Sequence, residues 1–283
     1  MINFGGSELN YSYDESEIVI VPVPYDGTST YMKGSDKGPE AILDASYNLE
    51  FFDIETGTEA HRRGIFTLAP VMESSSPEAM ADAVRSICSS LYGEGRFPVV
   101  LGGEHSVSIG AIQAAAARFS NLSVLQIDAH ADLRDEYMGS RFNHACVMAR
   151  ARELAPVVQV GIRSMSLEEL PLADRGRMFC AHEIWNDKAL YDNALALLTE
   201  NVYITIDLDG FDPGIMPSTG TPEPGGPPYR EIMNFLRRVI NSRNIAGFDV
   251  VELCPNGSNR APDFMAARIV YQLLSYREEQ RKD

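Results

Sequence analysis

Short runs of β-branched and other apolar residues alternate along the chain with longer segments of helical periodicity. This alternation is typical of parallel strands joined by crossover helices. It predicts strands over the ranges Glu17–Val23, Gly64–Leu68, Phe97–Leu101, Leu122–Asp128, Val157–Ile162, Arg177–Cys180, Val202–Asp207 and Asn244–Glu252. It predicts helices over the ranges Gly38–Phe52, Ser76–Tyr92, Ser106–Phe119, Asn143–Leu154, Asp187–Thr199, Tyr229–Asn241 and Ala261–Glu278. We therefore expect an α/β fold in which a parallel sheet of about eight strands is flanked by helices on both faces.

The same pattern indicates the domain organisation. No internal repeat and no linker-like change of composition interrupts it, so we expect residues 1–283 to form a single domain. The segment Asp212–Pro228 differs from the rest because six prolines and four glycines fall within its seventeen residues. It is too irregular for a helix or a strand. We interpret it as a rigid functional loop, with a purely structural connector as the alternative.

Composition and charge narrow the classes of function. The chain is 45% hydrophobic and 23% charged, which is ordinary for a globular protein and excludes a disordered or fibrous one. Its formal net charge of −16 would repel a polyanion, so we expect no nucleic-acid partner. The same charge is compatible with attraction of a small cationic substrate, although it could serve solubility alone.

The cysteines and the N-terminal residues indicate the compartment. The four cysteines show no Cys-x-x-Cys spacing, and a chain of this length needs no disulfide to stabilise its core. Residues 1–17 carry acidic groups where a secretion signal would need basic ones. No later segment approaches the roughly 18 apolar residues of a membrane span. We expect a cytoplasmic protein with no membrane partner.

The strongest chemical signal is a set of three potential metal ligands at the end of one predicted strand. Asp128, His130 and Asp132 follow the apolar run Leu122–Ile127, and residues two apart in an extended segment point the same way. Carboxylates held close together repel each other, and a divalent cation removes this penalty. The alternative is a polar turn that binds no metal.

Two further predicted strands end in potential ligands. One ends in Asp207 and Asp209, and the segment Gly102–Ser106 brings His105 to the carboxyl end of another. Because the carboxyl ends of parallel strands meet at one edge of a sheet, all the candidates should converge. The full set is His105, Asp128, His130, Asp132, Asp207 and Asp209. Two imidazoles and four carboxylates without a thiolate suit two borderline-hard ions such as Mn²⁺, with a hydroxide formed from water between them.

These segments resemble the strand-end motifs of the ureohydrolase family of arginases and agmatinases. The family patterns GG(D/E)HS, DAHxD and DxDxxDP correspond to Gly102–Ser106, Asp128–Asp132 and Asp207–Pro213. The similarity runs from about Val19 to Leu274 and includes the segments Gly38–Ile42, Gln159–Arg163, Thr219–Gly226 and Asp249–Glu252. The resemblance implies an arginase-like fold and a dinuclear manganese hydrolase that cleaves a guanidino group to urea and an amine. It also implies a homo-oligomer, a trimer or a hexamer.

The resemblance further implies roles for individual residues. The two ligand sets would be His105, Asp128, Asp132 and Asp207 for one Mn²⁺, and His130, Asp128, Asp207 and Asp209 for the other. Glu252 would hold the substrate, because a carboxylate matches the planar fork of a guanidinium. His144 would shuttle protons, and Asp132 would pass a proton to the departing amine.

One position departs from the family pattern. Arginases and many agmatinases place glycine after the shuttle histidine, whereas Ala145 follows His144 here. A methyl group costs little where the backbone φ is negative, so we expect metal binding to survive, although turnover could change. The departure keeps a second class of function open, a metal-binding paralogue without turnover.

Two features bear on the substrate. Arginases have an acid just after the Gly-x-Arg strand, where Ser166 stands here, so a contact to the α-ammonium of arginine is expected to be absent. The segment Thr219–Gly226, with Glu223 as a candidate substrate-binding acid, is more similar to agmatinases. We therefore expect agmatine as substrate and putrescine as the amine product. The alternatives are N-aminopropylagmatine, guanidinobutyrate, arginine, or another C–N bond such as that of formiminoglutamate or an acyl-lysine.

Overall fold

The strands of the described chain form one parallel sheet. In the computed structural model, which describes residues 3–282, the strand order is β2-β1-β3-β8-β7-β4-β5-β6. The strands are β1 (Ile18–Val23), β2 (Ile65–Thr67), β3 (Phe97–Gly102), β4 (Leu122–Ile127), β5 (Val157–Ile162), β6 (Met178–Cys180), β7 (Asn201–Asp207) and β8 (Asn244–Val251). Each neighbouring pair is parallel. The predicted α/β class and the predicted strands are confirmed, and β3, β8, β7 and β4 form the centre of the sheet.

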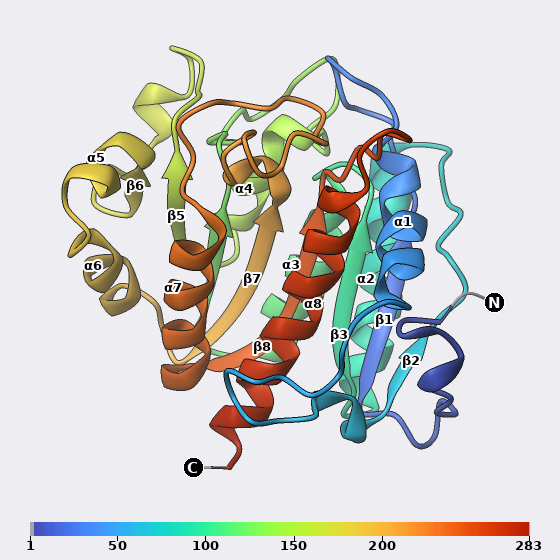
Figure 1. The fold of residues 1–283 in the computed structure, drawn as a ribbon. Coiled ribbons are helices and arrows are strands. Elements are labelled where there is room, and N and C mark those ends of the chain that lie inside the picture. The colour runs from blue at the N-terminus through green and yellow to red at the C-terminus, as the bar shows by residue number, and fades with distance from the viewer. Residues whose placement is uncertain (1–2, 283) are drawn as a thin grey trace.

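Helices cover both faces of this sheet (Figure 1). On one face, α1 (Gly38–Ser46) and α7 (Tyr229–Ser242) both pack against α8 (Ala261–Gln280). On the other face, α2 (Pro77–Gly93) packs against α3 (Val107–Arg118), and α3 contacts α4 (Val147–Ala151). The short helices α5 (Ala181–Asn186) and α6 (Leu190–Ala196) lie near the β6 edge. Short 3₁₀ turns occupy Gly6–Glu8, Ser35–Lys37, Ala60–Arg63, His144–Cys146, Leu170–Leu172 and Leu208–Gly210.

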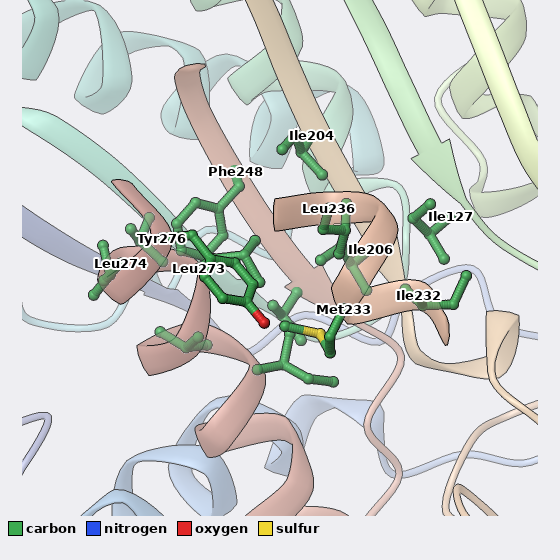
Figure 2. Packing of buried hydrophobic residues seen from close by; sticks show 14 of the residues in the cluster. Ile127, Ile204, Ile206, Ile232, Met233, Leu236, Phe248, Leu273, Leu274 and Tyr276 are labelled. Atoms are coloured by element: carbon green, nitrogen blue, oxygen red, sulfur yellow. The ribbon is translucent and has the colours of Figure 1, made fainter. Parts of the chain in front are cut away.

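Side chains of the central strands alternate between two hydrophobic cores, one on each face. Ile204 and Ile206 of β7 pack with Leu236 of α7 and Phe248 of β8 on the α7/α8 face (Figure 2). Tyr203, one residue away from Ile204, belongs to the separate core under α2 and α3. Residues two apart along a strand share a face. Burial on both faces explains why these strands appear in the sequence as nearly continuous apolar runs.

The first helix is shorter than the sequence predicts. It ends at Ser46, whereas the pattern indicated Phe52. The Ser46 hydroxyl donates to the carbonyl of Leu43 at 2.5 Å, a local bond that competes with helical pairing. Beyond that point, Phe51 packs edge to face on Tyr271 of α8. Packing against α8 therefore directs the chain away from the helix axis before the apolar pattern ends.

Two other predicted helices are also shorter, and one helix was missed. The region Asn143–Leu154 contains a 3₁₀ turn and then α4, and only α6 forms within Asp187–Thr199. Helix α5 was not predicted. It follows β6 directly, and Glu183 caps it by accepting the N–H of Cys180 at 3.3 Å. A helix of six residues is too short to show a periodic signal.

Residues 3–282 also bear on the expectations about membrane spans and disulfides. No helix within residues 3–282 is long and apolar enough to span a membrane. The four cysteines are free, and three of them are buried.

Candidate active site

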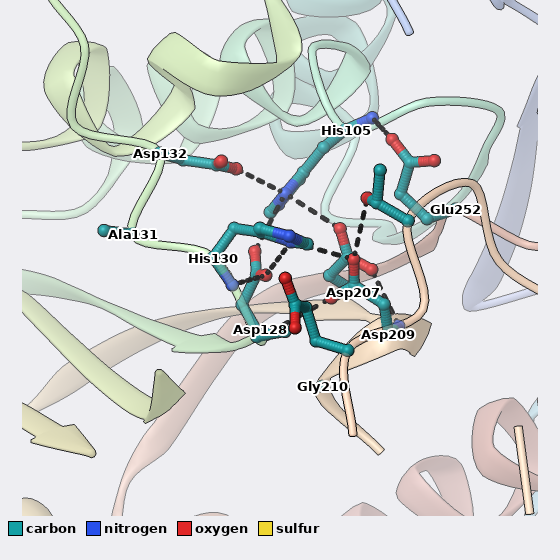
Figure 3. Close-up of polar contacts among 12 residues, drawn as sticks. His105, Asp128, His130, Ala131, Asp132, Asp207, Asp209, Gly210 and Glu252 are labelled. Atoms are coloured by element: carbon teal, nitrogen blue, oxygen red, sulfur yellow. Dashed lines mark hydrogen bonds and ion pairs between the residues drawn. The ribbon is translucent and has the colours of Figure 1, made fainter. Parts of the chain in front are cut away.

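The four central strands bring the candidate ligands to one edge of the sheet. β3 leads into His105, just before α3, and β4 leads into the segment Asp128–Asp132. β7 ends in Asp207 and continues to Asp209, while β8 ends one residue before Glu252. These strands are parallel neighbours, so their carboxyl ends coincide. Figure 3 shows the side chains converging on one another.

His105 lies among three carboxylates. Its Nδ1 is 2.9 Å from Asp132, 3.2 Å from Asp128 and 3.3 Å from Asp207. The side chain is 1% exposed. Burial alone would lower the pKa of His105, but the hydrogen bonds to these carboxylates outweigh burial and raise the pKa well above its usual value. A buried imidazole nitrogen that faces several carboxylates is an arrangement suited to a divalent cation.

A second group shares Asp128 with the first. Nδ1 of His130 is 2.9 Å from Asp209 and 3.7 Å from Asp128. One potential ligand atom from every member lies within 4.8 Å of the others in two sets, His105 with Asp128 and Asp132, and Asp128 with His130 and Asp209. Burial lowers the pKa of His130, but the charge of Asp209 and the hydrogen bond to Asp128 outweigh it and raise the pKa to about 12. The geometry offers two adjacent cation positions with a shared carboxylate.

Asp132 and Glu252 both have a left-handed backbone, with φ of 53° and 67°. This conformation costs a residue with a side chain roughly 1–2 kcal/mol. Neighbouring segments hold it in place, since the carbonyl of Asp132 accepts from Met148 and Ala149, and the N–H of Glu252 donates to Gly103. Strained backbone that the surroundings enforce in this way is concentrated at functional sites.

The carboxylate of Glu252 faces the pocket from the β8 side. Its Oε1 accepts the backbone N–H of His105 at 2.8 Å, and its Oε2 accepts the hydroxyl of Ser35 at 3.2 Å. Each oxygen keeps a second lone pair for a ligand. Burial, and then the charges of Glu104 and Asp209, raise the pKa of Glu252 to about 8. A cation bound beside Glu252, such as a guanidinium, would stabilise its ionised form and lower this pKa.

His144 lies on the wall of the pocket and contacts Thr28. Its backbone N–H donates to Oγ1 of Thr28 at 2.9 Å, and the same oxygen is 3.1 Å from Nδ1 of His144. The Thr28 hydroxyl therefore holds both the backbone and the ring of His144 in place. Burial, and then the charges of His105 and His130, lower the pKa of His144 to about 4. The ring is neutral at pH 7.

The pocket has a floor and a mouth of different character. We define the floor as the six candidate ligands, His105, Asp128, His130, Asp132, Asp207 and Asp209. We define the mouth as four loop residues that also line the pocket, Thr30, Arg134, Tyr137 and Met165. The guanidinium of Arg134 lies 4.4 Å from the ring centroid of Tyr137 and 3.7 Å from the carboxylate of Glu168. The mouth therefore contains a cation that is already partly paired.

Arg163 ties the proline-rich loop to the strand ends. Its guanidinium donates at 2.7–3.2 Å to the carbonyls of Gly161, Asp209, Gly210, Phe211, Glu223 and Pro224. Residues 212–228 form no helix or strand, as their composition predicts. Glu223 is half-buried and is not among the described residues that line the pocket. Its predicted contact with substrate therefore has no support from the pocket geometry.

Sequence reasoning missed two residues at the site, Glu169 and Thr28. Glu169 is 4% exposed and accepts the N–H of Leu133 at 2.9 Å and the N–H of Ser166 at 2.7 Å. Glu169 thus places a carboxylate next to Ser166, although both of its oxygens already accept hydrogen bonds. The Ser-x-x-Glu spacing of these two residues is a capping-box signal that could have indicated their contact. No such signal marks Thr28, because 116 positions separate it from His144.

Comparison with known proteins identifies the family. The arginase family profile matches residues 16–275. The N(1)-aminopropylagmatine ureohydrolase of Synechocystis sp. is 41% identical over 98% of this chain and 94% of that protein. The agmatinase of Pyrococcus horikoshii is 31% identical over 92% of each chain. The crystal structure of the agmatine ureohydrolase of Thermoplasma volcanium has a TM-score of 0.90 at 31% identity, and the match covers 100% of this chain and 96% of that one. The chain therefore belongs to the arginase family and is a ureohydrolase, an enzyme that hydrolyses guanidino compounds.

Proposed function

We propose that this ureohydrolase cleaves N(1)-aminopropylagmatine to urea and the corresponding amine at a dinuclear metal centre. The observation that carries the reaction is that Nδ1 of His105 faces buried carboxylates at 2.9–3.3 Å while the carboxylate of Glu252 faces the same pocket. Hydrolysis of a guanidinium needs a nucleophile and a group that holds the cation beside it. The floor and Glu252 are suited to these two tasks.

The donor set fits two Mn²⁺ ions. Nδ1 of His105 is buried and lies among carboxylate oxygens, but none of them is placed along an ordinary hydrogen-bond direction. The first ion would be held by His105, Asp128, Asp132 and Asp207, and the second by His130, Asp128, Asp207 and Asp209. Nitrogen and oxygen donors without a thiolate favour Mn²⁺ over structural Zn²⁺. When bound, the metals lower the pKa of water so that hydroxide is available at neutral pH.

Three side chains would guide the substrate and its protons. The lone pairs of Glu252 that remain free can accept two N–H groups of the guanidinium and so orient its carbon toward the floor. Asp132 would transfer a proton to the departing amine nitrogen. His144, held on the wall of the pocket by Thr28, would exchange protons between the pocket and solvent.

The relatives support the longer substrate. The sequence alone favoured agmatine, with N-aminopropylagmatine as an alternative, but identity is 41% to an enzyme named for N(1)-aminopropylagmatine and 31% to one named agmatinase. The two compounds share the guanidinium end, so the same floor serves both. They differ in the tail, which the mouth residues would contact. Agmatine is the second candidate substrate.

The alternative of a paralogue without turnover loses its main argument. Ala145 is not among the described non-glycine residues with positive φ, so its methyl group imposes no backbone strain. Its N–H donates to the side chain of Asn143 at 3.1 Å, in the turn that carries His144.

Steady-state urea release from a panel of guanidino compounds tests the proposal. We expect kcat/KM to be highest for N(1)-aminopropylagmatine, lower for agmatine, and far lower for 4-guanidinobutyrate and arginine, whose carboxylates would enter an acidic pocket. A preference for arginine or guanidinobutyrate would contradict the substrate assignment. Absence of urea from every compound with manganese present would contradict the reaction itself.

We also propose a cytoplasmic protein, in keeping with its cysteine usage, and a homo-oligomer, a trimer or a hexamer, as the family resemblance implies. Light scattering on the purified protein distinguishes these two states from a monomer.

A further inference from the structure

Asp249 is a buried carboxylate to which the proposed reaction gives no role. It lies in β8, between β3 and β7, and is 0% exposed. Its partner in the register of β7 is Thr205. The hydrogen bonds it accepts come from hydroxyl groups and not from a cation. A carboxylate buried in this way costs free energy, so packing alone does not account for it.

A chain of hydrogen bonds connects Asp249 to His105. The hydroxyl of Thr205 donates to Oδ1 of Asp249 at 2.6 Å, and the hydroxyl of Tyr203 donates to Oδ2 at 2.9 Å. The Thr205 oxygen also lies 2.9 Å from Nε2 of His105. All four side chains are at most 1% exposed. We call these residues, Asp249, Thr205, Tyr203 and His105, the Asp249 network.

The number of protons fixes the direction of these bonds. The Thr205 hydroxyl lies 2.6 Å from Oδ1 of Asp249 and 3.4 Å from the hydroxyl of Ser108, so it gives its one proton to the much nearer carboxylate. Its oxygen must then accept from His105, so the imidazole proton is on Nε2. Burial raises the pKa of Asp249 above its usual value, and the charge of His105 together with the hydrogen bonds from Thr205 and Tyr203 offsets only part of that rise.

This direction decides which ring nitrogen faces the floor. In the neutral imidazole, the form that binds a metal, a proton on Nε2 leaves a lone pair on Nδ1, and Nδ1 is the atom that lies 2.9 Å from Asp132 and 3.2 Å from Asp128. A lone pair opposite carboxylate oxygens is repelled unless a cation lies between them. We infer that Asp249 is a positioning residue that acts through Thr205 to hold His105 in the tautomer and orientation that bind one metal ion. The inference rests on the proposed dinuclear centre and deepens it.

His130 provides a comparison within the same molecule. Its side chain is 26% exposed, and its ring faces Asp209 and Asp128, outside the Asp249 network. Loss of the network should therefore weaken the ion held by His105 and spare the ion held by His130. Hydrogen-bond partners behind a ligating histidine typically contribute about 10- to 100-fold to metal affinity.

Manganese binding by purified variants, measured by equilibrium dialysis with elemental analysis, tests the inference without an activity assay. Thr205→Val removes the hydroxyl and keeps the shape, whereas Thr205→Ser keeps the hydroxyl. We expect Thr205→Val and Asp249→Asn each to bind one of two ions about 10- to 100-fold more weakly and the other unchanged. Thr205→Ser should bind both ions like the wild type. Tyr203→Phe should show a smaller loss, because Asp249 keeps its bond to Thr205.

Cys88→Ala is the matched control. Cys88 is 1% exposed, packs in the same core as Tyr203 and lies near enough to Asp249 to interact with its charge, but it is not a member of the hydrogen-bonded chain from Asp249 to His105. It should retain both ions. Circular dichroism of each metal-free variant establishes that it is folded, and Asp249→Asn serves if Thr205→Val does not fold.

The possible outcomes separate this inference from the proposed function. Two ions bound with wild-type affinity by folded Thr205→Val or Asp249→Asn would overturn the positioning role. A Thr205→Ser variant as weak as Thr205→Val would overturn it as well, because the hydroxyl would not be the relevant group. A wild-type protein that binds no manganese would overturn the proposed function, and the inference with it.

Discussion

The floor and the mouth of the pocket are held by different parts of the fold. The carboxylates of the floor are at most 7% exposed and follow directly from β4 and β7. The mouth residues are half-buried or exposed and come from three separate loops. Backbone pairing between strands fixes the floor, whereas side-chain packing between loops fixes the mouth.

This difference teaches where chemistry and selectivity reside. A ligand at a strand end cannot shift without breaking hydrogen bonds of the sheet, so the floor is preorganised. Loops vary without disturbing the strands that carry them. The class of reaction should therefore depend on the floor, and the choice among guanidino compounds on the mouth. Substitutions at graded distances from the floor test this division.

The largest effect is expected at Asp128, which belongs to both candidate metal groups. Asp128→Asn should abolish manganese binding and lower kcat/KM by more than about 100-fold, because the loss of an outer-shell partner alone already costs up to that much. Elemental analysis and urea release measure the two effects. The residual activity of Asp128→Asn should show the same order of preference among guanidino compounds as the wild type.

Asp174→Asn is the matched control, since this acid is 67% exposed and pairs with Arg177 away from the pocket. If Asp128→Asn kept both ions and near-normal turnover, the shared carboxylate would be wrongly assigned and the floor would not define the reaction.

Metal removal is expected to have the next largest effect. Four neighbouring carboxylates repel one another without cations, so chelation should lower the melting temperature. Manganese at roughly 100 times its dissociation constant should restore about 2.7 kcal/mol per independent site. Differential scanning calorimetry before and after verified metal removal measures this. An unchanged melting temperature would argue against a preformed floor.

The metal-free protein should also lose stability as the pH rises. The pKa of Glu252 is about 8 in the folded chain, against 4.5 when the group is unperturbed. The folded state thus holds a proton that the unfolded state releases, and this contribution is complete below about pH 4.5 and lost as the pH rises through about 8. Glu252→Gln binds no proton, so its melting temperature should fall less steeply over this range. Equal slopes would show that Glu252 is ionised throughout.

The floor could be predicted from the sequence because its ligands are local. Asp128, His130 and Asp132 fall within five residues directly after an apolar run, and strand periodicity alone places them at a sheet edge. The contact of Thr28 with His144 depends instead on loops that are 116 positions apart. The role of Asp249 could not be predicted either, because a single acid in an apolar strand does not reveal which hydroxyl groups surround it.

Glu252→Gln should lower activity while sparing the metals. The amide keeps the shape but loses the charge that would pair with the guanidinium, and the loss of one partner of a buried charge pair costs about 2–5 kcal/mol. We expect kcat/KM to fall at least about 30-fold for every substrate, with two manganese ions still bound. A drop confined to one substrate would mean that Glu252 acts on the tail and belongs functionally to the mouth.

Arg163 lies between the two regions and should have an intermediate effect. Arg163→Lys keeps the charge, but one ammonium cannot reach six carbonyls in the strand ends and the loop. We expect a roughly 10-fold lower kcat/KM, because displacement of positioning groups by about 1 Å can cost up to about 100-fold. Limited proteolysis should detect faster cleavage within residues 212–228. Arg141→Lys, at a side chain that is 52% exposed, is the control and should change neither.

The smallest effect, and the most informative about substrate, is expected at Arg134. Its guanidinium lines the pocket beside Tyr137, and Glu168 and Glu169 lie 3.7 and 3.9 Å away, so its charge is only partly neutralised. Exposed charges typically interact by about 0.2–1 kcal/mol, which corresponds to changes of roughly two- to fivefold. Arg134→Gln should therefore lower KM slightly for N(1)-aminopropylagmatine, less for agmatine, and raise it for 4-guanidinobutyrate.

The direction of each KM change is the decisive observation, because it depends on the charge of the substrate tail and not on the packing of the mouth. Arg134→Lys keeps the charge and should leave all three KM values close to the wild type. Arg85→Gln alters the net charge equally on the exposed surface of α2 and should not discriminate among the substrates. If KM rose for all three compounds in Arg134→Gln, the side chain would act by supporting Tyr137. The mouth would then select by shape, and the acidic character of the pocket would not explain a preference for a longer cationic tail.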